Sequence, residues 1–140
     1  MPPVISIGYE RRNIEEFVDL LEEYGVQTLL DIRELPLSRK KGFSKRALAA
    51  RLEQSGIQYS HLKIAGNPYR KQKDEIELCL RLYRNHLDDH PQVLNAVAEE
   101  FADAPTAILC YEREHCECHR SVLLDELQKQ GAVSDVIRVE

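Results

Sequence analysis

Short apolar runs alternate with amphipathic stretches along the chain. Runs at 4–7, 28–32, 57–60, 106–109 and 133–139 have the length and apolar content of buried strands. Helical spacing of apolar residues fills the intervals, and caps or breakers delimit the helices at Asn13–Tyr24, Ser44–Ser55, Asp74–Leu87, Pro91–Phe101 and Val122–Gly131. This alternation predicts one α/β domain over 1–140, a mainly parallel sheet of about five strands with helices on both faces.

The composition narrows the class of protein. A chain of 140 residues has the size of one domain, and it contains no run near the roughly 20 apolar residues that cross a bilayer. The first residues lack the basic and apolar regions of a signal peptide, so we expect a cytoplasmic protein without membrane association. Four cysteines in that setting are reduced, reactive or metal-binding rather than a disulfide frame. No nucleotide-cofactor motif is present, and the sequence leaves the oligomeric state undetermined.

The segment 110–120 is the strongest functional lead. It contains three of the four cysteines and two of the five histidines, and it lies between a predicted strand and a predicted helix. In open α/β sheets, ligands bind beyond the carboxyl ends of the strands. We therefore expect this segment to meet the other residues at or just past the carboxyl ends of strands, which are Glu10, Asp31 and Arg33.

Several short motifs together resemble a known family. They are Gly8-Tyr9-Glu10, Asp31-Ile32-Arg33 with Pro36 and Ser38-Arg39, Gly56-Ile57-Gln58-Tyr59, Leu109-Cys110-Tyr111-Glu112 and Cys118-His119-Arg120. In this order they resemble the proteins grouped as domain of unknown function 488. The resemblance implies a compact cytosolic α/β domain with these motifs as its site, and it implies no reaction. Cys116 and His115 lie outside the family pattern.

Arginines at the predicted rim suggest an anion pocket. The planar guanidinium groups of Arg33, Arg39 and Arg120 could bind phosphate or carboxylate through paired hydrogen bonds. They would do so beside a helix N-terminus, which favours anions. We add Tyr9, which could stack on a base or cover the sheet edge, and Ser38 to this substrate-binding set. The alternative is that Asp31 or Glu112 pairs with an arginine in a structural ion pair.

Cys118 is the candidate nucleophile. A helix N-terminus and the neighbours His119 and Arg120 each lower a thiol pKa, and His119 could carry the proton. The alternative is a packed Cys118 with His119 capping the helix. Glu10, Asp31 and Glu112 could act as general acids or bases, or they could simply pair with arginines.

A transition-metal site is conceivable on this segment but is not favoured. Cys116-x-Cys118 is tighter than the usual Cys-x2-4-Cys pair, and no second pair stands elsewhere in the chain. The candidate ligands would be Cys110, His115, Cys116, Cys118 and His119.

Two basic segments raise the possibility of nucleic-acid binding. The segment 38–46 holds five basic residues around Phe43, and 69–73 repeats the mixture with Tyr69. The basic residues of such a segment can bind the phosphate backbone of a nucleic acid while the aromatic ring stacks on a base. The alternative is a solvated loop that Phe43 anchors to the protein. The net charge of −5 would confine binding to one face.

The sequence thus predicts a small enzyme of unassigned reaction that acts on an anionic, phosphate-bearing substrate, for which a nucleotide or a nucleic acid is one option. A non-catalytic nucleic-acid-binding module is the first alternative. A metal or thiol redox sensor that uses Cys116 and Cys118 is the second.

Overall fold

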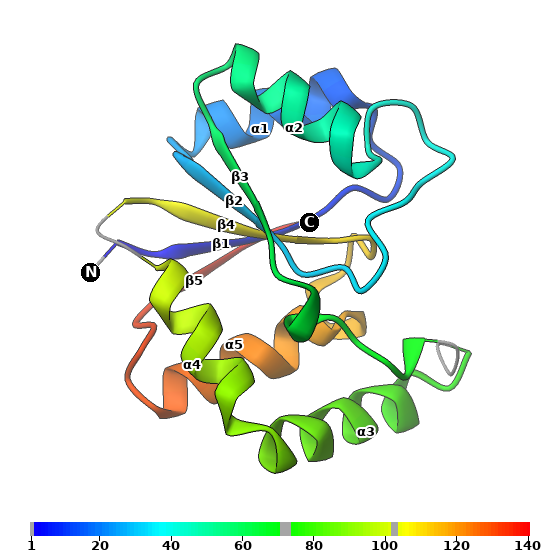
Figure 1. Cartoon of the computed structure of the whole chain (residues 1–140), viewed down its shortest axis with the longest axis vertical. Helices are drawn as coiled ribbons and strands as arrows, with labels where there is room; N and C mark the ends of the chain where they lie inside the picture. The colour runs from blue at the N-terminus through cyan, green and yellow to red at the C-terminus, as the bar shows by residue number, and fades with distance from the viewer. Residues whose placement is uncertain (1, 71–73, 102–103) are drawn as a thin grey trace.

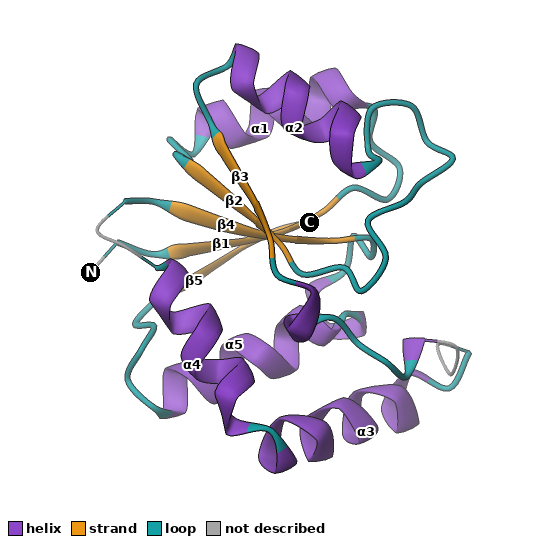
Figure 2. Cartoon of the chain, viewed as in Figure 1, coloured by secondary structure: helices purple, strands orange, loops and turns teal. Residues whose placement is uncertain are grey.

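One parallel sheet organises the chain. The computed structural model describes residues 2–70, 74–101 and 104–140, so Lys71 and Lys73 of the second basic segment lie outside the described residues. The strands, in the order β3-β2-β4-β1-β5, pair only in parallel (Figure 2). They are β1 (Val4–Gly8), β2 (Thr28–Asp31), β3 (Gln58–His61), β4 (Thr106–Cys110) and β5 (Val136–Val139).

Helices cover both faces of this sheet (Figure 1). One face carries α1 (Ile14–Glu23) and α2 (Lys45–Gln54), and the other carries α3 (Ile76–Asp89), α4 (Pro91–Glu100) and α5 (His119–Lys129). The short 3-10 helices η1 (Lys63–Ala65) and η3 (His115–Glu117) lie in loops of the described part of the chain. The predicted α/β fold is confirmed. None of the helices in the described part of the chain combines the length and apolar character needed to span a membrane.

The two faces of the sheet have separate cores because side chains alternate along a strand. On β4, Ala107 and Leu109 pack with α1 and α2, whereas Ile108 and Cys110 pack with α3, α4 and α5. The same alternation sends Cys110 into the core cluster that contains Cys118. Strand geometry therefore brings together two cysteines that are eight positions apart.

Several element boundaries differ from the predicted ones. The helix predicted from Asp74 begins at Ile76, and the strand predicted over 133–139 is limited to Val136–Val139. Asn13 caps α1 as predicted and forms a capping box with Glu16. Ser44 stands at the N-cap of α2, but its side chain does not cap the helix.

The sheet order creates a crevice at the carboxyl end of β4. The chain leaves β1 toward α1 on one face, whereas it leaves the adjacent β4 toward α5 on the other. Connections that diverge in this way open a space between them, which is the usual ligand position in open α/β sheets.

Candidate active site

A pocket of about 710 Å³ occupies this crevice. Its walls come from the segments that follow β1, β2 and β4 and from the first turns of α3. Of the residues predicted from the sequence, five line the pocket: Tyr9, Glu10, Arg33, Glu112 and His119. The lining does not include the other five, which are Asp31, Ser38, Arg39, Cys118 and Arg120.

Two glycines allow the pocket walls to approach one another. A Cβ on Gly8 would lie 1.9 Å from the carbonyl oxygen of Glu112, and a Cβ on Gly66 would lie 2.5 Å from Cα of Glu34. Next to Gly8, the backbone N–H of Glu10 donates to the carbonyl oxygen of Tyr111 at 2.9 Å. Gly8 thus lets the end of β1 pack against the loop that carries Glu112.

Cys110, Cys118 and His119 form a buried cluster at the floor of the pocket. The two sulfur atoms and a ring nitrogen of His119 all lie within 4.8 Å of one another. His119 Nδ1 is 3.7 Å from each sulfur, and Nε2 lies 3.1 Å from the carbonyl oxygen of Ile32. Since a carbonyl only accepts, Nε2 carries a proton, and Nδ1 is left facing the sulfurs.

The pKa values of the three groups in the cluster are shifted in different directions. Burial alone would raise the pKa of Cys118, but a hydrogen bond from the Cys110 thiol and the charges of Arg120 and His119 hold that pKa well below its usual range. The hydrogen bond to Cys118, together with burial, raises the pKa of Cys110. Burial opposes the charged form of His119, yet the adjacent Cys118 raises the pKa of the imidazole above its usual value. These shifts favour a Cys118 thiolate beside a protonated His119.

Arg120 lies beneath the cluster rather than in the pocket. It is fully buried, and its Nε–H and backbone N–H donate to Cys118 Sγ at 3.2 and 3.5 Å. Its Nη2 donates to the carbonyl oxygen of Glu112. The guanidinium therefore supports the cluster from below, and the pocket lining does not include it.

Glu112 lines the pocket together with Cys110 and His119 of the cluster. Its Oε2 is buried and has no hydrogen-bond partner. Burial, reinforced by the negative charge of Cys118, raises the pKa of Glu112 to about 7. A carboxyl group in this state can exchange a proton near neutral pH.

A family model for the domain of unknown function DUF488 matches residues 13–127. The chain belongs to the DUF488 family. Comparisons with curated proteins and with solved structures give no match. The family assignment agrees with the resemblance drawn from the short motifs, and it leaves the chemistry to be argued from the site.

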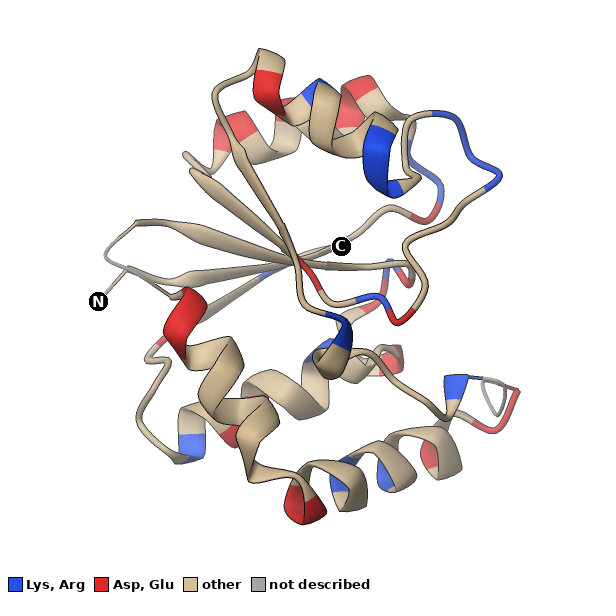
Figure 3. Cartoon of the chain, viewed as in Figure 1, with Lys and Arg blue, Asp and Glu red and all other residues tan. Residues whose placement is uncertain are grey.

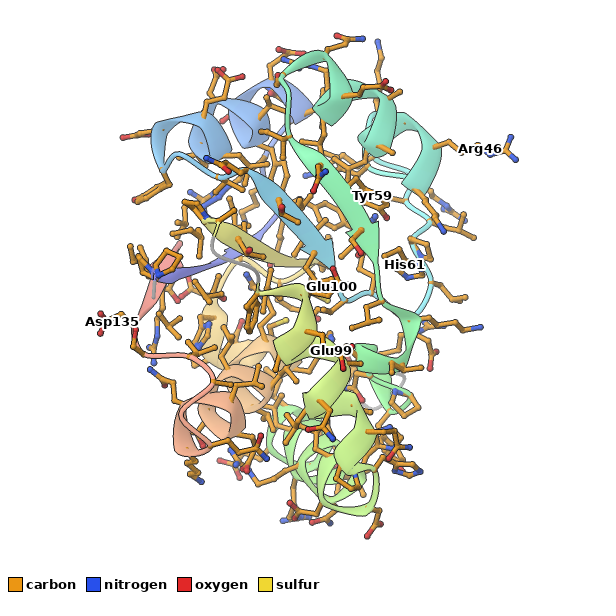
Figure 4. The ribbon with its side chains drawn as sticks, turned by 60° about the vertical axis from the view of Figure 1, so that its left-hand side comes forward. Arg46, Tyr59, His61, Glu99, Glu100 and Asp135 are labelled. Atoms are coloured by element: carbon orange, nitrogen blue, oxygen red, sulfur yellow. The ribbon has the colours of Figure 1, made fainter. Side chains whose placement is uncertain are left out.

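In this DUF488 protein, Asp31 and Arg33 form a buried ion pair. Arg33 donates from Nε to Oδ1 of Asp31 at 2.9 Å and from Nη2 to Oδ2 at 2.7 Å. Tyr59 OH also donates to Oδ2, and His61 Nε2 lies 2.8 Å from the carbonyl oxygen of Arg33. Figure 4 labels these two side chains on β3. Asp31 is fully buried, so this arrangement matches the structural ion pair that the sequence left open as the alternative.

The three arginines predicted to hold an anion do not converge. Arg33 is paired with Asp31, Arg120 lies beneath the cluster, and Arg39 is exposed on the loop before α2. The reason is that α5 begins at His119, which turns the side chain of Arg120 back under the loop that carries Glu112. Of the three guanidinium groups, the pocket lining includes only that of Arg33.

The loop before α2 is fastened to the protein by residues that the sequence assigned to binding. Phe43 is fully buried and stacks on Tyr9 with 4.6 Å between ring centroids. Ser44 Oγ donates to the carbonyl oxygen of Ser38, and Lys40 Nζ donates to that of Tyr9. Phe43 is thus the anchor of this loop and cannot stack on a base.

In the segment 110–120, the two cysteines that lie together are not Cys116 and Cys118, the pair that is nearest in the sequence. Cys116 is exposed, whereas Cys118 is buried and lies close to Cys110. His115 is buried and hydrogen-bonded to Ser6 Oγ at 2.7 Å. The sequence placed Cys110 among several candidate metal ligands, and the alternation of side chains along β4 shows that Cys110 lies on the face that also holds Cys118.

Further pocket residues could not be found from sequence motifs. They include Glu34, Leu35 and Leu37 after β2, and Asn67, Arg70, Asp74, Ile76, Cys79 and Leu80 in or before α3. Only the packing of α3 across the carboxyl edge of the sheet makes them neighbours of the cluster.

Proposed function

We propose that this protein is an enzyme and that the pocket at the end of β4 is its active site. Glu112 would transfer protons to and from the substrate, and the cluster of Cys110, Cys118 and His119 would supply the reactive group at the pocket floor. The reaction class that suits these groups is hydrolysis or group transfer at an electrophilic carbon.

One observation carries the proposal. A carboxyl, an imidazole and a thiol, on Glu112, His119 and Cys110, line a single pocket at the expected ligand position of an open α/β sheet. Glu112 lines this pocket, and its buried oxygen Oε2 has no hydrogen-bond partner among the described residues, so no protein group ties up that end of the carboxyl group. The volume is within the range of small-molecule sites, which is about 300–1,000 Å³.

The lining also bears on the substrate. Four exposed apolar side chains, Leu35, Leu37, Ile76 and Tyr111, lie around the pocket and favour a substrate with a planar or apolar body. Five carboxylates line it (Glu10, Glu34, Asp74, Glu112 and Glu117), against two arginines, Arg33 and Arg70.

Both arginines already have carboxylate partners, Asp31 and Glu34. We therefore propose a nucleoside-sized, heterocyclic or aromatic substrate with at most one phosphate, rather than a polyphosphate. The sequence analysis predicted a phosphate-bearing substrate, and in this pocket one phosphate would bind at Arg33 or Arg70.

The proposal includes a cytoplasmic location. The four cysteines are free, and two of them lie together in the cluster without being bonded. Paired free thiols of this kind are typical of a reducing compartment.

The test begins with a thermal-shift screen of nucleobases, nucleosides, nucleotides, phosphosugars and aromatic amides. Bound ligand raises the melting temperature by mass action. Ile76→Arg places a charge at the pocket, and Ile64→Arg is the matched control at an exposed apolar residue outside its lining. We expect hits that stabilise the wild type and Ile64→Arg but not Ile76→Arg.

Hits are then incubated with the protein, and products are followed by mass spectrometry. Glu112→Gln should keep binding and lose at least about 100-fold in turnover, as is common for a proton-transfer residue. Glu114→Gln, an exposed residue of the same loop, should turn over substrate like the wild type. Unchanged turnover by Glu112→Gln would refute the assigned role.

Nucleic-acid binding is the second candidate, and one observation favours it. Arg39, Lys41, Lys45 and Arg46 are all exposed within one loop and the helix turn that follows (Figure 3). The side chain of Arg46 projects away from the body of the protein (Figure 4). Because Leu37 of the same loop lines the pocket, this surface could hold a strand whose end enters the pocket.

A further inference from the structure

We propose that Cys110, Cys118 and His119 bind a transition-metal ion, preferably zinc, at the floor of the pocket. The inference rests on the proposed function only in its last step, where the ion activates water for the enzyme. The site itself follows from the ligand geometry and can be tested without a substrate.

The distances suit a tetrahedral ion. Zn–S bonds of about 2.3 Å and Zn–N bonds of about 2.0–2.1 Å at tetrahedral angles place sulfur and nitrogen about 3.6 Å apart. His119 Nδ1 lies 3.7 Å from Cys110 Sγ and 3.7 Å from Cys118 Sγ. All three ligand atoms fall within 4.8 Å of one another, as a shared ion requires.

The surroundings orient these ligands in the way that metal sites require. A metal-binding histidine usually donates its other ring N–H to a carbonyl or carboxylate, which fixes the ring and its tautomer. His119 does so through Nε2 to Ile32, and Nδ1 is thereby aimed at the two sulfurs. Two N–H groups of Arg120 donate to Cys118 Sγ, a pattern that suits a ligating thiolate.

The charge balance of the buried cluster also suits a cation. Two ligating thiolates would place two negative charges among buried side chains, the buried Arg120 opposes them with one positive charge, and a divalent ion would neutralise the remainder. Soft thiolate and imidazole ligands select zinc over magnesium or calcium. The donor set therefore specifies the class of metal.

Three protein ligands leave a fourth position, which is the mark of catalytic rather than structural zinc. Cys110 and His119 line the pocket and Cys118 does not, so the open position would face the pocket. Glu112, whose Oε2 has no partner, lies on the same wall two residues beyond Cys110.

If zinc is bound, it would supply a water of lowered pKa; Glu112 would take a proton from that water, and the oxygen of the water would bond to an electrophilic carbon of the substrate. The bond from that carbon to the leaving group breaks, and the proton passes from Glu112 to the departing group. The net change is addition of one water, without an oxidant or reductant.

The experiment uses the whole chain, purified without a histidine tag, reduced, and stripped of metal with a chelator. Zinc is titrated against a competing chelator, and cobalt is added separately as a spectroscopic probe. We expect one ion per chain and a cobalt spectrum with thiolate charge-transfer bands and the strong visible bands of tetrahedral coordination.

Two substitutions at ligands are compared with one control. Cys110→Ser and His119→Gln should each weaken zinc binding by more than the roughly 10–100-fold typical of changes outside the ligand shell. Cys116→Ser is the matched control, because Cys116 lies in the same loop but is exposed and outside the cluster. If a ligand variant fails to fold, the cobalt spectrum of the wild type still decides.

Three results would overturn the site. They are the absence of bound zinc in folded protein whose four cysteines all react as free thiols after unfolding, a cobalt spectrum without thiolate bands, and loss of zinc in Cys116→Ser equal to that in Cys110→Ser. Failure of the proposed function is a separate result: zinc binding without turnover of any hit would refute the enzymatic function. Undiminished turnover by metal-free protein would refute the catalytic role of the ion but not the site.

Discussion

His119 Nε2 donates a hydrogen bond of 3.1 Å to the carbonyl oxygen of Ile32, a residue 87 positions earlier in the chain. This contact joins the first residue of α5 to the end of β2. It fixes the imidazole with Nδ1 toward Cys110 and Cys118. The orientation of the candidate catalytic cluster is therefore set by a strand that contributes no side chain to it.

Arg120→Lys should lower the free energy of unfolding by about 2–4 kcal/mol. The planar guanidinium group of Arg120 donates to Cys118 Sγ and to the carbonyl oxygen of Glu112 at the same time, and a buried ammonium group cannot reproduce both hydrogen bonds. Urea unfolding followed by circular dichroism measures the loss. Arg81→Lys, at an exposed position of α3, should stay within about 0.5 kcal/mol of the wild type. Equal effects of the two substitutions would contradict the supporting role of Arg120.

Gly8→Ala should cost about 3 kcal/mol or more in the free energy of unfolding. The new Cβ would lie 1.9 Å from the carbonyl oxygen of Glu112, and backbone must move to relieve the overlap. Gly25→Ala is the comparison: it meets open space but has a φ of 67°, so we expect about 1 kcal/mol. A smaller loss for Gly8→Ala than for Gly25→Ala would show that the two loops do not approach so closely.

Asp31→Asn should lower the free energy of unfolding by about 3–5 kcal/mol, because it leaves the buried Arg33 without its counter-charge. Tyr59→Phe removes only one donor to the same carboxylate and should cost about 1.5–3 kcal/mol. Both values come from urea titrations. If Asp31→Asn proved nearly neutral, Asp31 would be available for chemistry rather than committed to the ion pair.

Lowering the pH should reduce the free energy of unfolding, in part because His115 takes up a proton in the unfolded chain. Burial, with the charges of Arg138 and Arg120, lowers the pKa of His115 to about 4. The unfolded chain, with a histidine pKa near 6.5, binds the proton first, so the unfolding free energy falls as the pH drops from about 6.5 to 4. The contribution, on the order of 3 kcal/mol, is fully present above that window.

His115→Gln separates this effect from the titration of carboxylates. Stability is measured by urea unfolding at several pH values between 4 and 7.5 for both proteins. We expect a shallower pH dependence in the variant, because the group that gains a proton on unfolding is gone. Parallel curves would mean that His115 is not held neutral by its surroundings.

Removal of the exposed cations at Arg39, Lys41, Lys45 and Arg46 tests the nucleic-acid candidate. If they contact phosphates, their replacement by alanine should weaken oligonucleotide binding and flatten its dependence on salt. Fluorescence anisotropy at several salt concentrations gives both quantities. A triple variant at the exposed acidic residues Glu15, Glu22 and Glu23 of α1 should not weaken binding, and undiminished affinity of the basic-loop variant would remove this candidate.

The alternation of apolar runs and helical spacing determined the fold class, because parallel strands joined by helices have few arrangements. It also determined that Glu10, Cys110 and Glu112 follow strand ends at one edge of the sheet. The motif Cys118-His119-Arg120 located the site at the start of α5. These features are local, so spacing along the chain is enough to find them.

Tertiary structure decided which of these residues meet. The strand order places β4 between β1 and β2, and the face on which each side chain lies assigns Cys110 to Cys118 rather than Cys116 to Cys118. Buried guanidinium groups need hydrogen-bond acceptors. Arg33 finds them in the carboxylate of Asp31, and Arg120 finds them in Cys118 Sγ and the carbonyl oxygen of Glu112. Spacing could not show this, since partners for buried charge are chosen by three-dimensional packing and not by distance along the sequence.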